Sequence, residues 1–196
     1  ILDNGAPDDP SDPKYVVFKF DADKWDDPSM AADRAAAVAQ GMEDKMYGDQ
    51  MLYFVMNDYA SHAAVFTKPP IGLEVRVLAF GFNRLGALGN TIFIKYTFVN
   101  KGQNDLLETY AGQFFDPDLG QSNDDAVGCD TTLGIGYVYN IDNYDDVYGA
   151  AVPAFACDFF QGPIVPSAGD TAFVPGQDPK VGYKMLNMTS FSAFIN

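Results

Sequence analysis

Five aspartates lie close together between residues 116 and 130, and they are the strongest chemical signal in the sequence. They are Asp116, Asp118, Asp124, Asp125 and Asp130. Carboxylates this close repel one another unless water or a cation neutralises them. Calcium binds six to eight oxygen ligands and tolerates irregular loops, so aspartates and neighbouring carbonyl groups suit it. We therefore expect a calcium site in this segment, with a solvated acidic turn as the alternative.

Two further acidic clusters have a similar composition and are weaker metal candidates. The first contains Asp21 and Asp23, directly after an expected strand. The second contains Asp142, Asp145 and Asp146, between two expected strands. Short carboxylates also cap the backbone of turns in proteins that bind no metal. Each cluster is therefore either a metal site or an ordinary capped turn.

The sequence contains two cysteines, Cys129 and Cys157. In an oxidising compartment they could form a disulfide, which would stabilise the fold by about 3.5 kcal/mol in the chain-entropy model. Alternatively, they are two buried thiols that pack as small apolar side chains. Both alternatives stay open, because a disulfide needs Cα atoms within about 7 Å of each other and the sequence does not give that distance.

Residues arranged for catalysis are scarce. The single histidine, His62, lies in a loop-like segment, so multi-histidine zinc sites are excluded and one imidazole is left to activate a nucleophile. The sequence has no Gly-x-Ser-x-Gly motif, phosphate-binding loop or Cys-x-x-Cys pair. With 27 acidic residues, some pair suits glycoside hydrolysis by chance alone. We therefore expect no enzymatic activity, and a hydrolase that uses an Asp pair or His62 is kept as an alternative.

Tyrosines gather near the acidic cluster at residues 142–146. They are Tyr137, Tyr139, Tyr144 and Tyr148. An aromatic ring with a polar tip can stack on a sugar, so these side chains could form a carbohydrate-binding platform. The spacing of two between Tyr137 and Tyr139 also fits a strand face that packs in a core or an interface.

Short strands are the elements that must position these residues. The chain has 24 Asp but only 3 Glu, with 18 Gly and 12 Pro, and this composition favours turns over helices. Apolar and polar residues alternate with a period of two and predict strands at 15–20, 51–56, 73–82, 91–100, 107–115, 134–140, 154–160 and 189–195. Asp27, Pro28 and an Ala-rich run that ends at Gly41 predict one short α-helix near residues 28–40. The expected fold class is all-β, an antiparallel β-sandwich similar to a jelly roll with about eight strands.

The domain organisation follows from composition. Residues 1–14 are rich in Asp and Pro and have little to bury, so we expect an extended arm or linker. Residues 15–196 have the size of a single domain, which we expect to be a piece of a longer chain. A net charge of −15 makes nucleic acid an unsuitable partner. No apolar run is long enough for a membrane-spanning helix.

Several short motifs between residues 48 and 163 form a recognisable series. They include Gly48-Asp49-Gln50, Phe80-Gly81-Phe82-Asn83, Asp116-Pro117-Asp118-Leu119-Gly120, Val127-Gly128-Cys129-Asp130-Thr131 and Asp158-Phe159-Phe160-Gln161-Gly162-Pro163. This series resembles the amino-terminal β-rich region of large secreted proteins of bacteria with a type IX secretion system. Most of those proteins are uncharacterised, and the region typically precedes further β-domains and a C-terminal sorting domain. The resemblance covers more than half of the chain.

The resemblance implies a protein that is released from the cell or held at its surface, and it implies no known reaction. It also bears on modification, because Asp130-Thr131-Thr132 and Asp170-Thr171-Ala172 resemble the short O-glycosylation motif of such bacteria. Glycans are therefore expected at Thr131 and Thr171. Independently, Asn187-Met188-Thr189 fits the N-glycosylation sequon, so Asn187 is a third candidate.

Taken together, these observations predict a non-enzymatic extracellular structural or surface module stabilised by calcium. Its expected partners are other copies of itself or other surface proteins, together with glycans. The arm at residues 1–14 motivates self-assembly into a filament or adhesion, because an extended segment can add a strand to the exposed sheet edge of a neighbour. A carbohydrate-binding module is the first alternative and an extracellular hydrolase the second.

Overall fold

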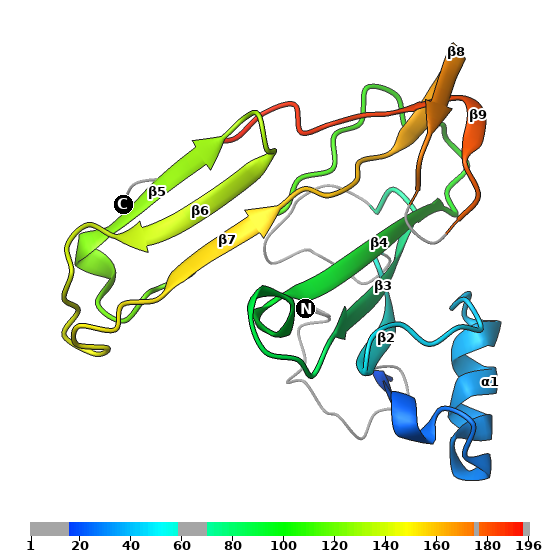
Figure 1. Ribbon diagram of the computed structural model, residues 1–196. Helices are drawn as coiled ribbons and strands as arrows, with labels where there is room; N and C mark the ends of the chain where they lie inside the picture. Colours follow the sequence, from blue (N-terminus) through cyan, green and yellow to red (C-terminus); the bar gives the residue numbers. More distant parts are fainter. Residues whose placement is uncertain (1–15, 59–69, 175–176, 194–196) are drawn as a thin grey trace. The chain divides into compact units, whose positions relative to one another are not determined.

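The structure is a computed structural model that describes residues 16–58, 70–174 and 177–193 (Figure 1). The expected arm at residues 1–14 and His62 lie outside the described residues. The chain divides into two compact units, Ile1–Tyr110 and Ala111–Asn196, and each has its own sheets. That residues 15–196 behave as one domain stays a prediction.

Unit 1 contains a four-stranded antiparallel sheet and the single α-helix of the described chain (Figure 1). The strand order is β1-β2-β3-β4, with β1 at Phe18–Asp21, β2 at Gln50–Asn57, β3 at Leu73–Gly81 and β4 at Ile92–Asn100. The helix α1 spans Ala31–Ala39, and short 3-10 helices occupy Ala22–Lys24, Pro28–Met30 and Ala87–Asn90. Asp27 accepts a hydrogen bond from the backbone N–H of Ser29 (2.8 Å), so the helical segment begins where the sequence predicts.

The core of unit 1 forms between one face of this sheet and the helical segment. Strand β1 alternates, so Phe18 and Phe20 point inward and keep only 6% and 1% of their surface exposed. They pack with Met51 and Tyr53 of β2, Leu78 of β3, Ala37 of α1 and Met42. Packing of this kind explains why an Ala-rich helix is used, since small side chains let the helix approach the sheet closely.

Unit 2 contains two smaller antiparallel sheets. The first has the order β5-β6-β7, with β5 at Asp125–Asp130, β6 at Ile135–Asn140 and β7 at Ala154–Asp158, and the second pairs β8 at Ile164–Ala172 with β9 at Lys180–Met185. A 3-10 helix at Ser122–Asp124 leads into β5. Leu119 and Val138 are buried, and the rings of Phe115 and Phe155 lie 5.3 Å apart between centroids. These residues give unit 2 an apolar centre of its own.

The predicted fold class is confirmed: the described chain is all-β and sandwich-like, with nine strands in three antiparallel sheets and one short α-helix. Two of the expected strands are wrong. Residues 107–115 are irregular, with Leu107 and Tyr110 about four-fifths exposed, and the described part of 189–195 is also irregular. Within the described ranges, no strand pairs with these segments, and alternation alone does not make a strand. Strands β5, β8 and β9 were not predicted.

Candidate functional site

Asp145 is the most deeply buried charged residue of the described chain, with 0% of its surface exposed. Its carboxylate accepts hydrogen bonds from the backbone N–H groups of Gln121 (2.8 Å), Val147 (2.8 Å) and Tyr148 (2.7 Å). These bonds, led by the one from Gln121, lower the pKa of Asp145 below the ordinary value of an aspartate. The carboxylate therefore ties the segment before β5 to the turn after β6.

Gly120 makes this approach possible. Its φ is +85°, and a Cβ at this position would lie only 2.3 Å from Oδ1 of Asp145. No side chain fits there, so both the backbone conformation and the contact require glycine. The glycine of the motif Asp-Pro-Asp-Leu-Gly thus has a steric role beside a buried carboxylate.

Asn140 connects Asp145 to a second pair of carboxylates. It is 7% exposed at the end of β6, its side chain hydrogen-bonds to Asp145, and its Nδ2 donates to Oδ2 of Asp124 (3.1 Å). The adjacent Asp125 accepts a hydrogen bond at Oδ2 from the backbone N–H of Leu119 (2.9 Å). Asn140 therefore links the carboxylates of Asp145 and Asp124, and Asp125 is the next residue in the chain at the same end of the β5–β6 hairpin.

Asp124 and Asp125 each leave one oxygen without a hydrogen-bond partner. In both side chains this atom is Oδ1, and it is fully buried. A buried carboxylate oxygen without a donor is costly, because it has lost its water and gained no partner. A cation would relieve this cost, and a carboxylate oxygen is a ligand that calcium accepts. The unpartnered oxygens of Asp124 and Asp125 are thus of a chemical type that suits calcium.

The five aspartates predicted as calcium ligands do not gather at one point. Asp124 and Asp125 are adjacent and partly buried, as just described. Asp130 lies at the other end of β5, where its Oδ1 accepts hydrogen bonds from the backbone of Thr132 (2.8 Å) and Leu133 (3.1 Å) and so caps a turn. Asp116 and Asp118 are exposed. Because β5 is an extended strand, it carries Asp130 away from the Asp124–Asp125 pair.

No group of three or more His, Cys, Asp or Glu side chains is arranged around a common point in the part of the chain that the structure describes. Any cation at Asp124 and Asp125 must therefore complete its shell with carbonyl groups or water. Asn140 was not predicted as a site residue, and Asp145 was predicted only as a weaker metal candidate than the aspartates of the 116–130 segment. Asn140 is two residues after the buried Val138 on the same strand, so it lies on the same inward face. This spacing of two is the signal that could have identified Asn140 as a buried polar residue.

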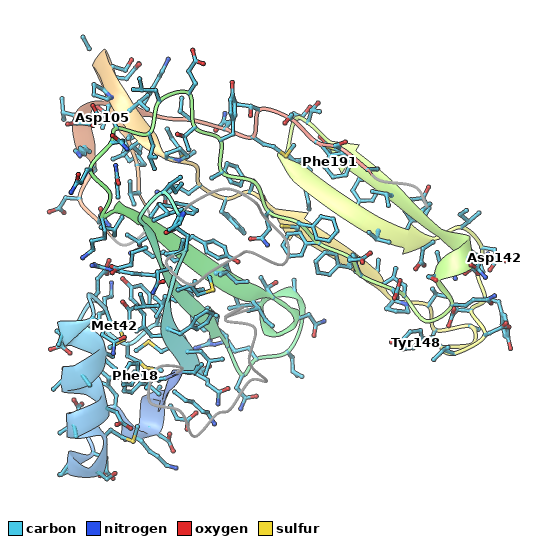
Figure 2. All side chains as sticks on the ribbon, turned by 180° about the vertical axis from the view of Figure 1, so that it is seen from behind. Phe18, Met42, Asp105, Asp142, Tyr148 and Phe191 are labelled. Atoms are coloured by element: carbon cyan, nitrogen blue, oxygen red, sulfur yellow. The ribbon has the colours of Figure 1, made fainter. Side chains whose placement is uncertain are left out.

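The other weak candidates behave as turn residues. Asp142 is exposed, and its Oδ1 accepts a hydrogen bond from the backbone N–H of Tyr144 (2.8 Å). Asp146 is exposed beside the buried Asp145. Figure 2 labels Asp142 and Tyr148, which lie at the same end of the β5–β7 sheet. The cluster at 142–146 thus contributes one residue, Asp145, to the buried network.

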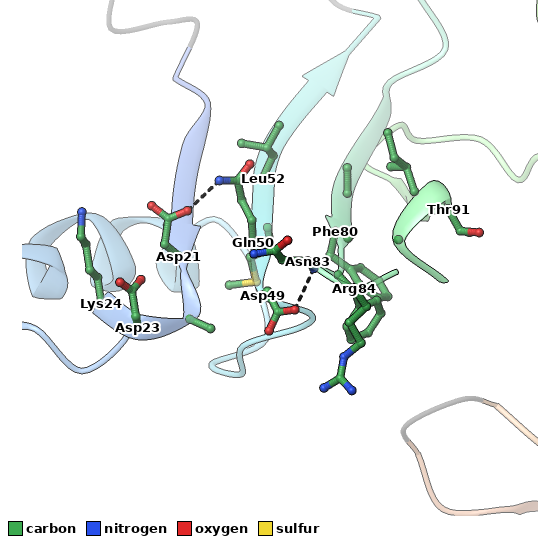
Figure 3. A pocket seen from close by; sticks show the side chains of 17 residues that line it. Asp21, Asp23, Lys24, Asp49, Gln50, Leu52, Phe80, Asn83, Arg84 and Thr91 are labelled. Atoms are coloured by element: carbon green, nitrogen blue, oxygen red, sulfur yellow. Dashed lines mark hydrogen bonds between the residues drawn. The ribbon is translucent and has the colours of Figure 1, made fainter. Parts of the chain in front are cut away.

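Asp21 and Asp23 line an open groove of about 1080 Å³ at one end of the unit 1 sheet (Figure 3). Oδ1 of Asp21 accepts a hydrogen bond from Gln50 Nε2 (2.7 Å). A third carboxylate, Asp49, was not predicted, and its Oδ2 accepts from the backbone N–H of Asn83 (2.9 Å). Lys24 and Arg84 also line the groove. Lys19 Nζ also lies 3.8 Å from Oδ2 of Asp21. A metal ion at Asp21 and Asp23 stays a prediction.

Cys129 and Cys157 are free thiols in the structure, which thus has the second of the two alternatives that the sequence left open. The register pairs each of them with Gly136, which lies on the strand between them. Their Cα atoms are thus two strand spacings apart, about 9–10 Å, and a disulfide needs about 7 Å or less. The ring of Phe191 packs at Gly136, because a Cβ there would lie 2.7 Å from the ring (Figure 2). Burial raises the pKa of the Cys157 thiol.

Two of the predicted platform tyrosines lie side by side on β6. The ring centroids of Tyr137 and Tyr139 are 6.0 Å apart. The ring of Tyr137 also covers Gly128 of β5, since a Cβ there would lie 2.4 Å from the ring. The residues paired with these tyrosines on both neighbouring strands are all small: Ala126, Gly128, Ala154 and Ala156. The tyrosine faces therefore rise above a row of small side chains on each side.

No family model, curated protein or solved structure matches the chain. The site has to be interpreted from its own geometry.

The remaining predicted positions lie on the surface. Thr131, Thr171 and Asn187 are exposed, which glycosylation requires, and their modification stays a prediction. Tyr144 and Tyr148 are exposed in the turn after β6. Among the described residues, the helices are all too short or too polar to cross a bilayer.

Proposed function

We propose that the chain is a non-enzymatic, extracellular structural or surface module, and that a calcium ion stabilises its second unit. The observation that carries this proposal is the pair of buried, unpartnered oxygens on Asp124 and Asp125. Two adjacent carboxylates with unmet ligand capacity are expected where a cation belongs to the folded state. The resemblance to secreted bacterial proteins supports an extracellular setting.

The surrounding network supports a structural role for the ion. Nδ2 of Asn140 donates a hydrogen bond to Asp124, and the backbone N–H of Leu119 donates one to Asp125. Oδ2 of each aspartate already accepts a hydrogen bond, so an ion at the two Oδ1 atoms would bind carboxylates whose positions are fixed. Such an ion would tie the 119–125 segment to the end of β6, which is a structural role.

Calcium should raise the melting temperature of unit 2 by about 10–20 °C relative to the chelated protein. Calcium that binds only the folded state stabilises it by about 2.7 kcal/mol when the free calcium concentration is about a hundred times the dissociation constant. For a unit of this size, that free energy corresponds to the stated rise in melting temperature. The measurement is a calorimetric melt with calcium and with chelator, followed by elemental analysis. Equal melting temperatures, or no retained metal, would contradict the proposal.

Matched variants sharpen this experiment. Asp124→Asn and Asp125→Asn should abolish the calcium increment, and each should leave the chelated protein at least as stable as the parent, because a costly buried charge is removed. Asp118→Asn is the control, since it removes one charge from an exposed position of the same segment. If Asp118→Asn lost the increment as well, the effect of calcium would be general screening rather than binding at this pair.

A second candidate function, carbohydrate binding, is favoured by the paired tyrosines of β6. Tyr137 is braced against Gly128, and both rings stand beside alanines rather than beside large side chains. A rigid aromatic pair with open faces suits the apolar face of a sugar ring, and neighbouring hydroxyl groups suit a polar rim. The spacing of 6.0 Å between the ring centroids allows both rings to contact one chain of sugars.

If this second function holds, Tyr139→Ala should weaken retention on a bound polysaccharide by about tenfold, because a stacked aromatic ring contributes about 1–1.5 kcal/mol. The measurement is affinity electrophoresis in gels that contain a panel of soluble polysaccharides. Tyr110→Ala, at a tyrosine of unit 1 that is 82% exposed, should leave retention unchanged. Lack of retardation of the parent protein in every gel would reject carbohydrate binding.

A further inference from the structure

One face of the β5–β6–β7 sheet carries an exposed row of aromatic and small residues. Tyr137 and Tyr139 alternate along β6 with the buried residues Val138 and Asn140, so the two tyrosines lie on the outer face, 37% and 45% exposed. Paired residues of neighbouring strands share a face, which places three residues of β7 beside β6 on this outer face. They are Ala154, Ala156 and Asp158, and we call them, together with Tyr137 and Tyr139, the tyrosine strip.

The strip is more open toward β7 than toward β5. The ring of Tyr137 leans over β5, since a Cβ at Gly128 would lie 2.4 Å from it. The three strip residues of β7 are all exposed, whereas the residues at the matching positions of β5 are partly buried. Strand β7 is also an edge of its sheet (Figure 1). A ligand that contacts the tyrosine rings therefore has room to lie along β7.

Asp158 stands at one end of this open path. It pairs with Ile135, and Asp130 pairs with the same residue from the other side, so both aspartates belong to the outer face. Their Cα atoms are two strand spacings apart, about 9–10 Å. Along β7, Asp158 lies two residues beyond Ala156, the partner of Tyr137, which is a rise of about 7 Å. A carboxylate is thus within reach of a ligand that covers Tyr137.

This stretch of the chain supplies no positive charge of its own. Residues 102–179 contain 13 acidic residues and no Lys, Arg or His. Every ion pair between described residues lies in unit 1. The calcium ion proposed above would bind at Asp124 and Asp125, at the opposite end of β5 from Asp130. Among the described residues, Asp158 therefore has no cationic partner with which a ligand would compete.

We infer that the tyrosine strip binds a carbohydrate that carries free amino groups, with sugar rings stacked on Tyr137 and Tyr139 and an ammonium group paired with Asp158. This inference rests on the second candidate function, carbohydrate binding, and names the class of carbohydrate. It does not depend on the calcium site.

Each part of an amino sugar has a counterpart on the strip. The apolar face of a sugar ring stacks on a tyrosine, whose hydroxyl tip stays in water. An ammonium group donates a charge-assisted hydrogen bond to a carboxylate, and the face of an aromatic ring attracts the same charge. A neutral sugar gains the stacking alone, and an acidic sugar is repelled by Asp158 and Asp130. Amino sugars should therefore bind most tightly and acidic sugars least.

The shape of the strip favours a chain of sugars over a small cation. Four residues separate Ile135 from Tyr139, which corresponds to about 13 Å along β6. The two rings form an open row, with their centroids 6.0 Å apart, and do not enclose a single ammonium group as an aromatic cage does. An isolated amine would thus leave most of the aromatic surface uncovered.

The first test is isothermal titration calorimetry of the full chain with a β-1,4-linked glucosamine hexasaccharide and with its fully N-acetylated counterpart. A mildly acidic pH keeps the amines protonated, and physiological salt largely screens charges more than about 8 Å apart. The amino form should bind at least about tenfold more tightly, because only this form makes a charge-assisted bond. Equal affinities overturn the inference and leave carbohydrate binding standing, whereas no binding of either ligand rejects both.

Two matched variants locate the preference. Asp158→Asn should reduce the ratio of the two affinities to about threefold or less, since the amide keeps the shape of the side chain and removes its charge. Asp178→Asn is the control, because Asp178 is also exposed but lies outside the β5–β6–β7 sheet. If the two variants reduce the ratio equally, the preference comes from the overall negative charge, and the inference is overturned.

Tyr139→Ala and a basic peptide separate stacking from charge. Tyr139→Ala should weaken binding of both hexasaccharides by about tenfold and leave their ratio unchanged. A lysine hexapeptide, titrated under the same conditions, should bind more weakly than the amino hexasaccharide, because it has no sugar rings to stack. Tight binding of the peptide, or unchanged affinities in Tyr139→Ala, would show that the strip recognises charge without sugar and would overturn the inference.

Discussion

Asp145→Ala should unfold or severely loosen the end of the β5–β6 hairpin, with a fall in the melting temperature of unit 2 of about 10 °C or more. The variant removes a fully buried acceptor and leaves the backbone N–H groups of Gln121, Val147 and Tyr148 without a partner. Unpaired buried donors are costly, because they lose a hydrogen bond and regain no water. Amide hydrogen exchange at these three positions measures the effect directly, and it should accelerate there before it does so in unit 1.

Gly120→Ala should have a comparable effect from the opposite side of the contact, because its Cβ would lie 2.3 Å from the Asp145 carboxylate. Gly149→Ala is the matched control. Gly149 also has a positive φ, +64°, but a Cβ there meets nothing within 4 Å. The difference between the two variants thus isolates the contact from the cost of the backbone conformation. Equal losses in both would show that the carboxylate contact contributes little.

The pH dependence of unit 2 provides a further readout of Asp145. Its pKa is lower in the folded state than the value of about 3.9 for an unperturbed aspartate. The ionised carboxylate therefore stabilises the fold above that value, and this contribution is lost as the pH falls through the lowered pKa of the folded state. Asp145→Asn should flatten the acid limb of stability against pH. An unchanged acid limb would mean that other carboxylates govern it.

Phe20→Ala should destabilise unit 1 by about 3–5 kcal/mol, the usual cost of removing a buried phenylalanine. Phe20 is 1% exposed, and its ring lies edge-on to Trp25 at 5.4 Å between centroids. Because Trp25 is the single tryptophan of the chain, its fluorescence reports unfolding of this core without a contribution from unit 2. Leu85→Ala, at a fully exposed position, should change stability by no more than about 0.5 kcal/mol.

Calorimetry tests this prediction directly, because the two units are expected to unfold in separate transitions. If Phe20→Ala lowers the calorimetric transition of unit 2 as much as that of unit 1, the two cores are not independent. A loss below about 1 kcal/mol would mean that the site collapses around the missing ring or that Phe20 contributes little packing.

Strand β4 and the helix show which parts of the fold the sequence predicts well. Alternation over Thr91–Asn100 predicted β4 within one residue, and the cap at Asp27 with the Ala-rich run predicted the helical segment. Both signals are local, since a strand face and a helix cap depend on residues a few positions apart. Local signals failed at residues 107–115, because a strand also needs a neighbour and the sequence does not state which segments pair.

The site was predicted in part, for a related reason. The density of carboxylates drew attention to the 116–130 segment, and Asp124 and Asp125 do hold buried oxygens. The sequence could not show that Val127-Gly128-Cys129 continues as strand β5 and separates Asp130 from the pair. Nor could it show that Asn140 and Asp145 return to the same place, because that contact joins residues about 20 positions apart through the β5–β6 hairpin.

Gly136 has a consequence for where this chain can fold. By holding Cys129 and Cys157 on opposite sides of a middle strand, it makes the covalent connectivity of the protein the same in reducing and in oxidising surroundings. A reductant such as glutathione therefore has no crosslink to attack between these two thiols, and an oxidant cannot join them unless the β5–β6–β7 sheet rearranges.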